Sequence, residues 1–132
     1  MKILMLDTDI SSYVIRGNEL GVMEKFESSF PVLCISCITA AELQFGACRK
    51  NSKVLTEKVE AFCNLLPVKE WNLKTAHHYG RIKAALEKNG TPLGSMDILI
   101  AACAVEAGAV LVTNNTKHFS KVPGLKVINW LE

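Results

Sequence analysis

The sequence predicts an α/β protein with a mainly parallel sheet that helices cover on both faces. Short apolar runs with strand character alternate with amphipathic helical patterns along the chain. That alternation is typical of βα units, which build parallel sheets buried between helices. A late helical segment, residues 96–107, is so rich in alanine and aliphatic residues that we expect it to be buried.

Length and composition indicate one domain over residues 1–132. The chain has 132 residues, 49% of them apolar, which is enough for a substantial core. No repeat, linker or low-complexity stretch interrupts it. The formal net charge of +2 neither requires nor excludes a nucleic-acid partner, so any basic surface must come from local arrangement.

Local signals set the elements of the first half. Asp7 ends the first apolar run, and Thr8-Asp9 opens a helix that stops near Gly17-Asn18. Pro31 ends the second helix. We therefore expect strands at residues 2–6 and 32–36, and helices at 10–15, 20–28, 38–50 and 54–66.

The second half follows the same logic. Asn89-Gly90 is a good helix stop, Ser95 is a plausible N-cap, and Gly108 ends the alanine-rich helix. Pro123-Gly124 turns the chain into a last strand. We expect strands at residues 67–71, 109–112 and 126–128, and helices at 73–88 and 96–107.

Three carboxylates and one amide are placed to meet at one edge of this sheet. Asp7 follows the first strand, Glu42 lies early in the helix after the second, and Asp97 begins the alanine-rich helix. Asn115 follows the strand at 109–112. Because a crossover helix starts at the carboxyl edge of a parallel sheet, all four belong to that edge. Hard oxygen ligands gathered there suit Mg²⁺ or Mn²⁺.

Each residue also has an ordinary structural interpretation. Thr39 to Glu42 fits a capping box, Asp97 in a first helical turn favours the dipole, and Asp7 could start an Asx turn. Asp9 fits either a helix cap or a supporting role at a metal site. Taken together, clustered carboxylates would repel one another, a cost that a divalent cation reverses. A metal-acidified water could then attack phosphorus.

Four sequence blocks in order resemble PIN-domain ribonucleases, and most closely VapC-type toxins of toxin–antitoxin pairs. The blocks are MLDTDI, ITAAELQFGA, GTPLGSMDILIAA and LVTNNTKHFSKVPGL. The resemblance covers nearly the whole chain. It implies a three-layer α/β/α sandwich around a parallel sheet of four or five strands, and an endoribonuclease that uses Mg²⁺ or Mn²⁺.

The resemblance also implies roles for individual residues. Asp7 and Asp97 would bind the metal directly, and Glu42 would bind it directly or through water and help to deprotonate the nucleophile. Asn115 would orient a metal-bound water or a phosphate. It stands where many relatives have an acid, so one negative charge is missing from the place of a second metal. Thr113 matches a hydroxyl often found beside that site.

The same resemblance implies partners. They are an RNA substrate, structured RNA such as tRNA being the family expectation, a second copy of the chain in a homodimer, and a cognate VapB-like antitoxin whose tail blocks the active site. The apolar run after Lys2 is too short for a secretion signal and no stretch is long enough to span a membrane. We expect a cytoplasmic protein.

Other polar and aromatic residues leave alternatives open. Lys117, His118 and Lys121 fit either RNA phosphate contacts or a solvated loop. Four large aromatic side chains are more typical of core than of base stacking: Trp71, Trp130, Phe45 and Phe119. The five cysteines are more typical of buried or semi-buried thiols than of a zinc or redox site.

Two rival functions remain. Asp7-Thr8-Asp9 resembles the nucleophile motif of haloacid-dehalogenase-type phosphatases, but that reading needs a downstream acidic pair, and only Glu132 is acidic after Asn115. The other rival is a non-catalytic PIN-like binding or repressor subunit. It predicts that Asp97→Asn changes nothing, whereas the nuclease predicts lost cleavage.

Overall fold

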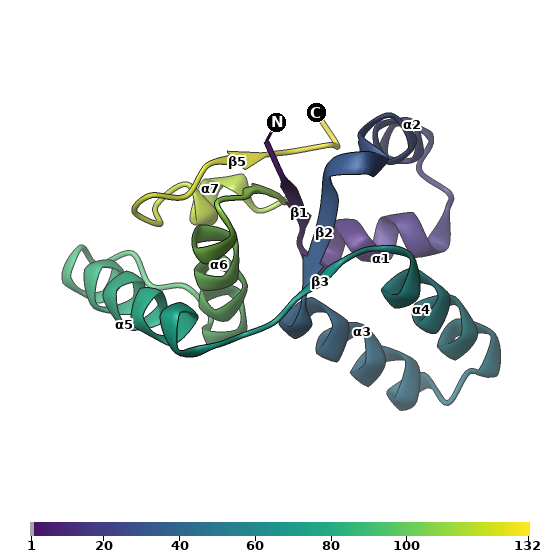
Figure 1. Cartoon of the computed structure of the whole chain (residues 1–132), viewed down its shortest axis with the longest axis horizontal. Helices are drawn as coiled ribbons and strands as arrows, with labels where there is room; N and C mark the ends of the chain where they lie inside the picture. The colour runs from purple at the N-terminus through teal and green to yellow at the C-terminus, as the bar shows by residue number, and fades with distance from the viewer. Residues whose placement is uncertain (1) are drawn as a thin grey trace.

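A five-stranded sheet forms the centre of the molecule. The structure is a computed structural model that describes residues 2–132 (Figure 1). The strand order is β3-β2-β1-β4-β5, and every neighbouring pair is parallel. The strands are β1 (Leu4–Leu6), β2 (Leu33–Ser36), β3 (Val68–Lys69), β4 (Val110–Val112) and β5 (Val127–Ile128). The predicted parallel α/β sheet is confirmed.

Helices cover both faces of this sheet. In Figure 1, α5, α6 and α7 lie on one side of the strands, and α1 to α4 lie on the other. The helices are α1 (Thr8–Arg16), α2 (Leu20–Ser29), α3 (Cys37–Lys50), α4 (Lys53–Leu65), α5 (Leu73–Lys88), α6 (Ser95–Ala107) and α7 (Thr116–Phe119). A 3₁₀ turn at Phe30–Val32 links α2 to β2.

The alternation of side chains along the strands makes the two cores. Met5 and Leu111 are paired in register and belong to the core under α5 and α6. Leu6 and Val112, one residue further, belong to the core under α1 to α4. Because successive strand residues point to opposite faces, each short strand contributes to both layers. The three-layer α/β/α arrangement is confirmed.

Between its polar ends, from Ile98 to Val105, helix α6 is apolar around its whole circumference. Six of its residues are buried, namely Ile98, Ile100, Ala101, Ala102, Cys103 and Ala104. It packs on α5 and on the sheet, so no broad polar face is needed. The prediction of a buried alanine-rich helix is confirmed.

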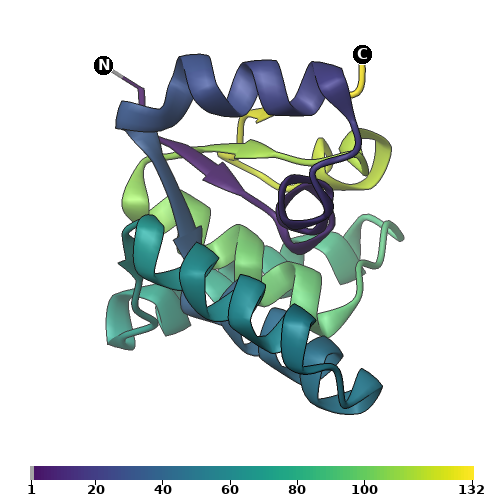
Figure 2. The same ribbon diagram turned by 90° about the vertical axis from the view of Figure 1, so that its right-hand side faces the viewer.

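The carboxyl ends of the central strands lie on one side of the molecule. In Figure 2 the arrow of β1 points to the side where α1 and α7 lie. The Asp7 amide continues the parallel pairing by donating to the Val112 carbonyl over 3.0 Å. Segments that follow β1 and β4 are therefore neighbours there, as the strand pattern predicted.

Several local predictions are wrong. Ser95 is not the N-cap of α6, because Gly94 occupies that position and its carbonyl accepts the Ile98 amide over 3.0 Å. Helix α7 was not predicted, since four residues are too few to show a helical period. Phe45 is not in the core but 63% exposed, whereas Phe119 and Trp130 are buried as predicted. Trp71 is partly buried.

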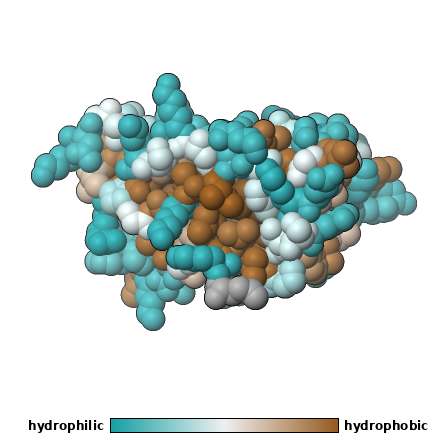
Figure 3. All heavy atoms as spheres, turned by 90° about the horizontal axis from the view of Figure 1, so that it is seen from above, coloured by the Kyte–Doolittle hydropathy of each residue, from teal (hydrophilic) through white to brown (hydrophobic). Residues whose placement is uncertain are grey.

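The surface adds two observations. Figure 3 looks down on the end of the molecule that carries both termini in Figure 1, and apolar side chains gather in its middle between polar margins. Within residues 2–132, no helix combines the length and the apolar composition needed to cross a membrane.

Candidate active site

An open cleft at the carboxyl edge of the sheet collects the predicted polar residues. Its volume is about 330 Å³. It is lined by Asp7, Thr8, Asp9, Ser12, Glu42, Asp97, Ile100, Asn115 and Phe119. The structure therefore brings together Asp7, Glu42, Asp97 and Asn115, which come from four separate elements or their caps.

Asp7 is held at the centre of this edge by the backbone around it. It leaves β1 and is the N-cap of α1, where its Oδ1 accepts the Ile10 amide over 2.8 Å. The Asx-type interpretation is thus correct locally. Only one of its carboxylate oxygens is used by that cap, and the residue also lines the cleft.

Burial makes Asp7 unusual among the acids of the chain. Only 6% of the residue is exposed, and burial raises the pKa of its carboxyl from 3.8 to about 6. The Thr113 hydroxyl and the Ile10 amide oppose that rise, while the charges of Asp9 and Asp97 add to it. A cation in the cleft would offset the cost of keeping this carboxylate ionised.

Asp97 lies in the first turn of α6 and is half-buried. Burial raises the pKa of its carboxyl, and the negative charge of Glu42 raises it further. The neighbouring His118 lowers it. The negative charges of neighbouring acids thus raise the pKa of both Asp7 and Asp97, which agrees with the expected repulsion between clustered carboxylates.

Glu42 does not form the predicted capping box. The N-cap of α3 is Ser36, whose Oγ accepts the Thr39 amide over 3.0 Å. This cap lies three residues before Thr39, so Glu42 is in the second turn of α3 and not at the capping-box position. The Glu42 carboxylate instead accepts a hydrogen bond from the Thr8 hydroxyl at its Oε1.

Asn115 and Thr113 lie beyond the end of β4. Thr113 is fully buried, and its Oγ1 accepts the Asn115 amide over 2.9 Å. Asn115 is the N-cap of α7, but its side chain makes no capping hydrogen bond. The side chain of Asn115 is therefore not committed to α7, and it lines the cleft.

The remaining candidates divide between the cleft and its neighbourhood. Asp9 is exposed at the cleft and is not the helix cap, because Asp7 takes that position. Lys117 and His118 do not line the cleft but an adjoining hollow. Sequence reasoning missed Thr8 and Ser12 as cleft residues. Their spacing of four in one helix, starting beside Asp7, was the available signal.

The donor set of the cleft fits a hard divalent cation. Carboxylate and amide oxygens dominate it, and neither cysteine nor histidine lines it. Within residues 2–132, however, no three acidic, histidine or cysteine side chains are grouped closely enough to enclose a metal. Mg²⁺ is usually held by one or two carboxylates and several waters, so two of the carboxylates that line the cleft would be enough to hold such an ion.

The fold and the site together define the class of protein, which is a three-layer α/β/α protein with a parallel sheet and an acidic cleft at the carboxyl edge of that sheet. Residues 4–125 match the PIN domain family. The chain is 39% identical over 128 residues to Ribonuclease VapC2 of Haemophilus influenzae, covering 96% of this chain and 97% of that protein. It is 35% identical over 130 residues to the tRNA(fMet)-specific endonuclease VapC of Salmonella typhimurium, covering 96% of each.

A solved structure supports the same assignment. The chain superposes on a chain of VapBC2 from Rickettsia felis bound to a promoter DNA fragment, with a TM-score of 0.88 and 34% identity. The match covers 97% of this chain and 98% of that one. The chain belongs to the PIN domain family and, within it, to the VapC ribonucleases. This membership favours the nuclease over the phosphatase alternative.

Proposed function

We propose that the protein is an Mg²⁺- or Mn²⁺-dependent endoribonuclease and the toxin of a toxin–antitoxin pair. One observation carries the proposal: Asp7, Glu42, Asp97 and Asn115 line a single cleft in a chain of the VapC ribonuclease family. Helix capping accounts for Asp7 alone among the four, because Ser36 caps α3, Gly94 caps α6 and the Asn115 side chain makes no capping bond. A metal site would account for the meeting of all four in one cleft.

Asp7 and Asp97 would hold the metal, and Glu42 would contact it directly or through water. A bound divalent cation supplies a Lewis acid that acidifies water and stabilises charge on phosphorus. Glu42, positioned by Thr8, accepts a proton from the attacking water. Asn115 donates from its side-chain amide to a phosphate oxygen or orients a water, because an amide cannot act as a base.

This chemistry predicts the products. Attack by water on the phosphodiester leaves a 3′-hydroxyl and a 5′-phosphate, and the ribose 2′-hydroxyl takes no part. An obligatory 2′,3′-cyclic phosphate would contradict the mechanism. Structured RNA such as tRNA is the substrate class we propose, supported by the Salmonella relative named as tRNA(fMet)-specific.

Two protein partners belong to the proposal. The Rickettsia felis structure is a VapBC assembly, which supports a VapB-like antitoxin as the partner of this chain. A homodimer is the second expectation. The apolar side chains that gather on the face in Figure 3 support an interaction surface, since such patches mark association sites.

The test is cleavage of purified tRNA and of total RNA with Mg²⁺ or Mn²⁺, beside EDTA and beside an Asp97→Asn protein. Asn keeps the size of the side chain but removes its charge. Discrete fragments with 5′-phosphates, formed by the wild type alone and lost with EDTA, would support the proposal. Equal behaviour of wild type and variant in every assay would instead favour the non-catalytic binding or repressor subunit.

A further inference from the structure

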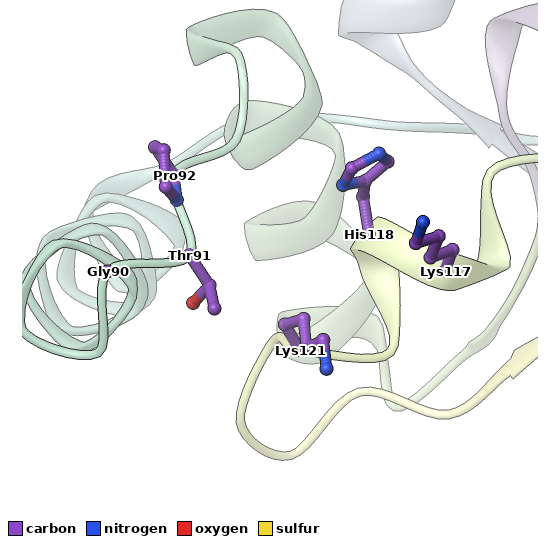
Figure 4. A pocket seen from close by; sticks show the side chains of 6 residues that line it. All are labelled: Gly90, Thr91, Pro92, Lys117, His118 and Lys121. Carbon is purple, nitrogen blue, oxygen red and sulfur yellow. The ribbon is translucent and has the colours of Figure 1, made fainter.

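A second hollow adjoins the active-site cleft on the other side of α7. Its volume is about 340 Å³. In Figure 4 the loop of residues 90–92 lies on one side, and Lys117, His118 and Lys121 lie on the other. We call this the basic hollow; it is lined by Gly90, Thr91, Pro92, Lys117, His118 and Lys121.

The basic hollow carries the positive charge of two lysines. Its lining includes two lysines and a histidine but no carboxylate. All three basic residues are exposed, and within residues 2–132 none of their side chains joins an ion pair or a hydrogen bond. The two lysine ammonium groups are therefore free to meet an anionic ligand.

Helix α7 separates this hollow from the cleft. Asn115 and Phe119 line the acidic cleft, whereas Lys117 and His118 line the basic hollow. The turn that divides them is closed by the Phe119 amide bonding to the Asn115 carbonyl over 3.1 Å. His118 is near enough to Asp97 for its charge to lower the pKa of that carboxyl. The two hollows are thus adjacent parts of one surface.

The far wall of the basic hollow is held in place by the backbone. Gly90 follows α5 with a φ of +68°, a conformation that glycine adopts without strain. This turn lets the Thr91 amide donate to the Leu86 carbonyl over 2.9 Å. The wall opposite the lysines therefore does not depend on a ligand for its shape.

We propose that the basic hollow binds a backbone phosphate of the RNA next to the phosphodiester that is cleaved, with Lys117 and Lys121 as the contacts. The inference rests on the proposed nuclease function. The acidic cleft repels phosphate except where a cation is bound, so the strand needs positive charge as it leaves the cleft. Lysine contacts to phosphate position the strand without reading its sequence.

The first experiment measures the salt dependence of tRNA binding in EDTA, where no cleavage occurs. The variant Lys117→Gln/Lys121→Gln is compared with Lys58→Gln/Lys74→Gln, which removes two exposed lysines outside both hollows. We expect the first variant to lose about tenfold in affinity, and its log–log salt slope to be smaller by roughly 1 to 2. The control should match wild type.

Phosphate-ethylation interference then locates the contact. Ethylation next to the cleaved bond should weaken binding of wild type but not of Lys117→Gln/Lys121→Gln, because the charged partner is already gone. In cleavage assays the same variant should raise KM with little change in kcat. Lys117→Arg/Lys121→Arg should behave like wild type, which a merely structural role of the lysines would not require.

The outcomes separate this inference from the function on which it rests. If wild type cleaves tRNA but the glutamine variant keeps the same salt slope and ethylation pattern, the basic hollow does not bind phosphate. If wild type neither binds nor cleaves RNA, the proposed function fails and this inference fails with it. If ethylation next to the cleaved bond weakens RNA binding by wild type and by the control variant but not by Lys117→Gln/Lys121→Gln, the inference is supported.

Discussion

The Thr8 hydroxyl donates a hydrogen bond to Oε1 of Glu42, a residue 34 positions away in the sequence. Thr8 is the first residue of α1, and Glu42 is on α3. The Thr8 hydroxyl also lies 3.2 Å from Oγ1 of the buried Thr39. One small side chain therefore links the start of α1 to α3 and orients a carboxylate at the cleft.

Thr8→Val should impair catalysis without disrupting the fold. Valine has nearly the shape of threonine but cannot donate to Glu42, so the carboxylate loses its orientation. Loss of such a supporting contact lowers activity by about 10- to 100-fold. The measurement is kcat/KM for RNA cleavage, with Thr8→Ser as the control that keeps the hydroxyl. Unchanged kcat/KM in Thr8→Val would show that the contact has no role.

Asp7→Asn should stabilise the metal-free protein at neutral pH. The pKa of Asp7 is 3.8 in the unfolded chain and about 6 in the fold, so the folded state holds the proton more tightly. Stability from this group is fully present below pH 3.8, falls as pH rises to about 6, and is then level. At neutral pH, Asp7→Asn avoids a loss of folding stability on the order of 3 kcal/mol.

Urea unfolding in EDTA at pH 4.0 and 7.5 checks the effect of Asp7. We expect the variant to gain much stability over wild type at pH 7.5 and much less at pH 4.0, where the folded carboxyl is protonated and the unfolded one is only partly ionised. Asn can still accept the Ile10 amide, so the cap of α1 is retained. A gain of equal size at both pH values would mean that ionisation is not the cause.

Asn115→Asp should tighten metal binding. It places a fifth carboxylate in the cleft, beside Asp7, Asp9, Glu42 and Asp97, where one more negative charge near a divalent cation lowers the free energy of the bound ion. We expect Mn²⁺ to bind about tenfold more tightly, or ~1.4 kcal/mol, in isothermal titration calorimetry. Asn114→Asp adds the same charge outside the lining of the cleft and should have a much smaller effect. If both substitutions tightened Mn²⁺ binding equally, the overall charge of the protein would be the cause, and not the position of the new carboxylate in the cleft.

Phe119→Ala should lower the free energy of unfolding much more than Phe45→Ala, because only Phe119 lies in the core. Phe119 is 1% exposed and belongs to the core under α5 and α6, so its truncation should cost about 3 to 5 kcal/mol in urea unfolding. Phe45 is 63% exposed, and the Arg49 guanidinium lies over its ring, 5.6 Å from the centroid. Because most of the side chain is exposed, its loss should cost about 0.5 kcal/mol. Similar costs would contradict the burial of Phe119.

The alternation of elements was predictable because it rests on local patterns. Asp7 ends a strand, and Asn89-Gly90 ends a helix whose last residue is Lys88. The capping residue of α3 was not predictable, because Ser36 and Thr39 offer competing N-terminal signals only a few residues apart. Phe45 was misplaced for a related reason. In a helix of mixed composition, the periodic pattern does not fix which apolar residues face inward.

The sequence by itself determined the parallel α/β fold and the four residues placed to meet at its carboxyl edge. Both follow from strand and helix signals and from the geometry of βα crossovers, which are local rules. Only the tertiary structure decided that β1 lies between β2 and β4, that Thr8 contacts Glu42, and that α7 divides the acidic cleft from the basic hollow. Those relationships depend on how distant segments pack, and the raised pKa of Asp7 depends on the burial that this packing creates.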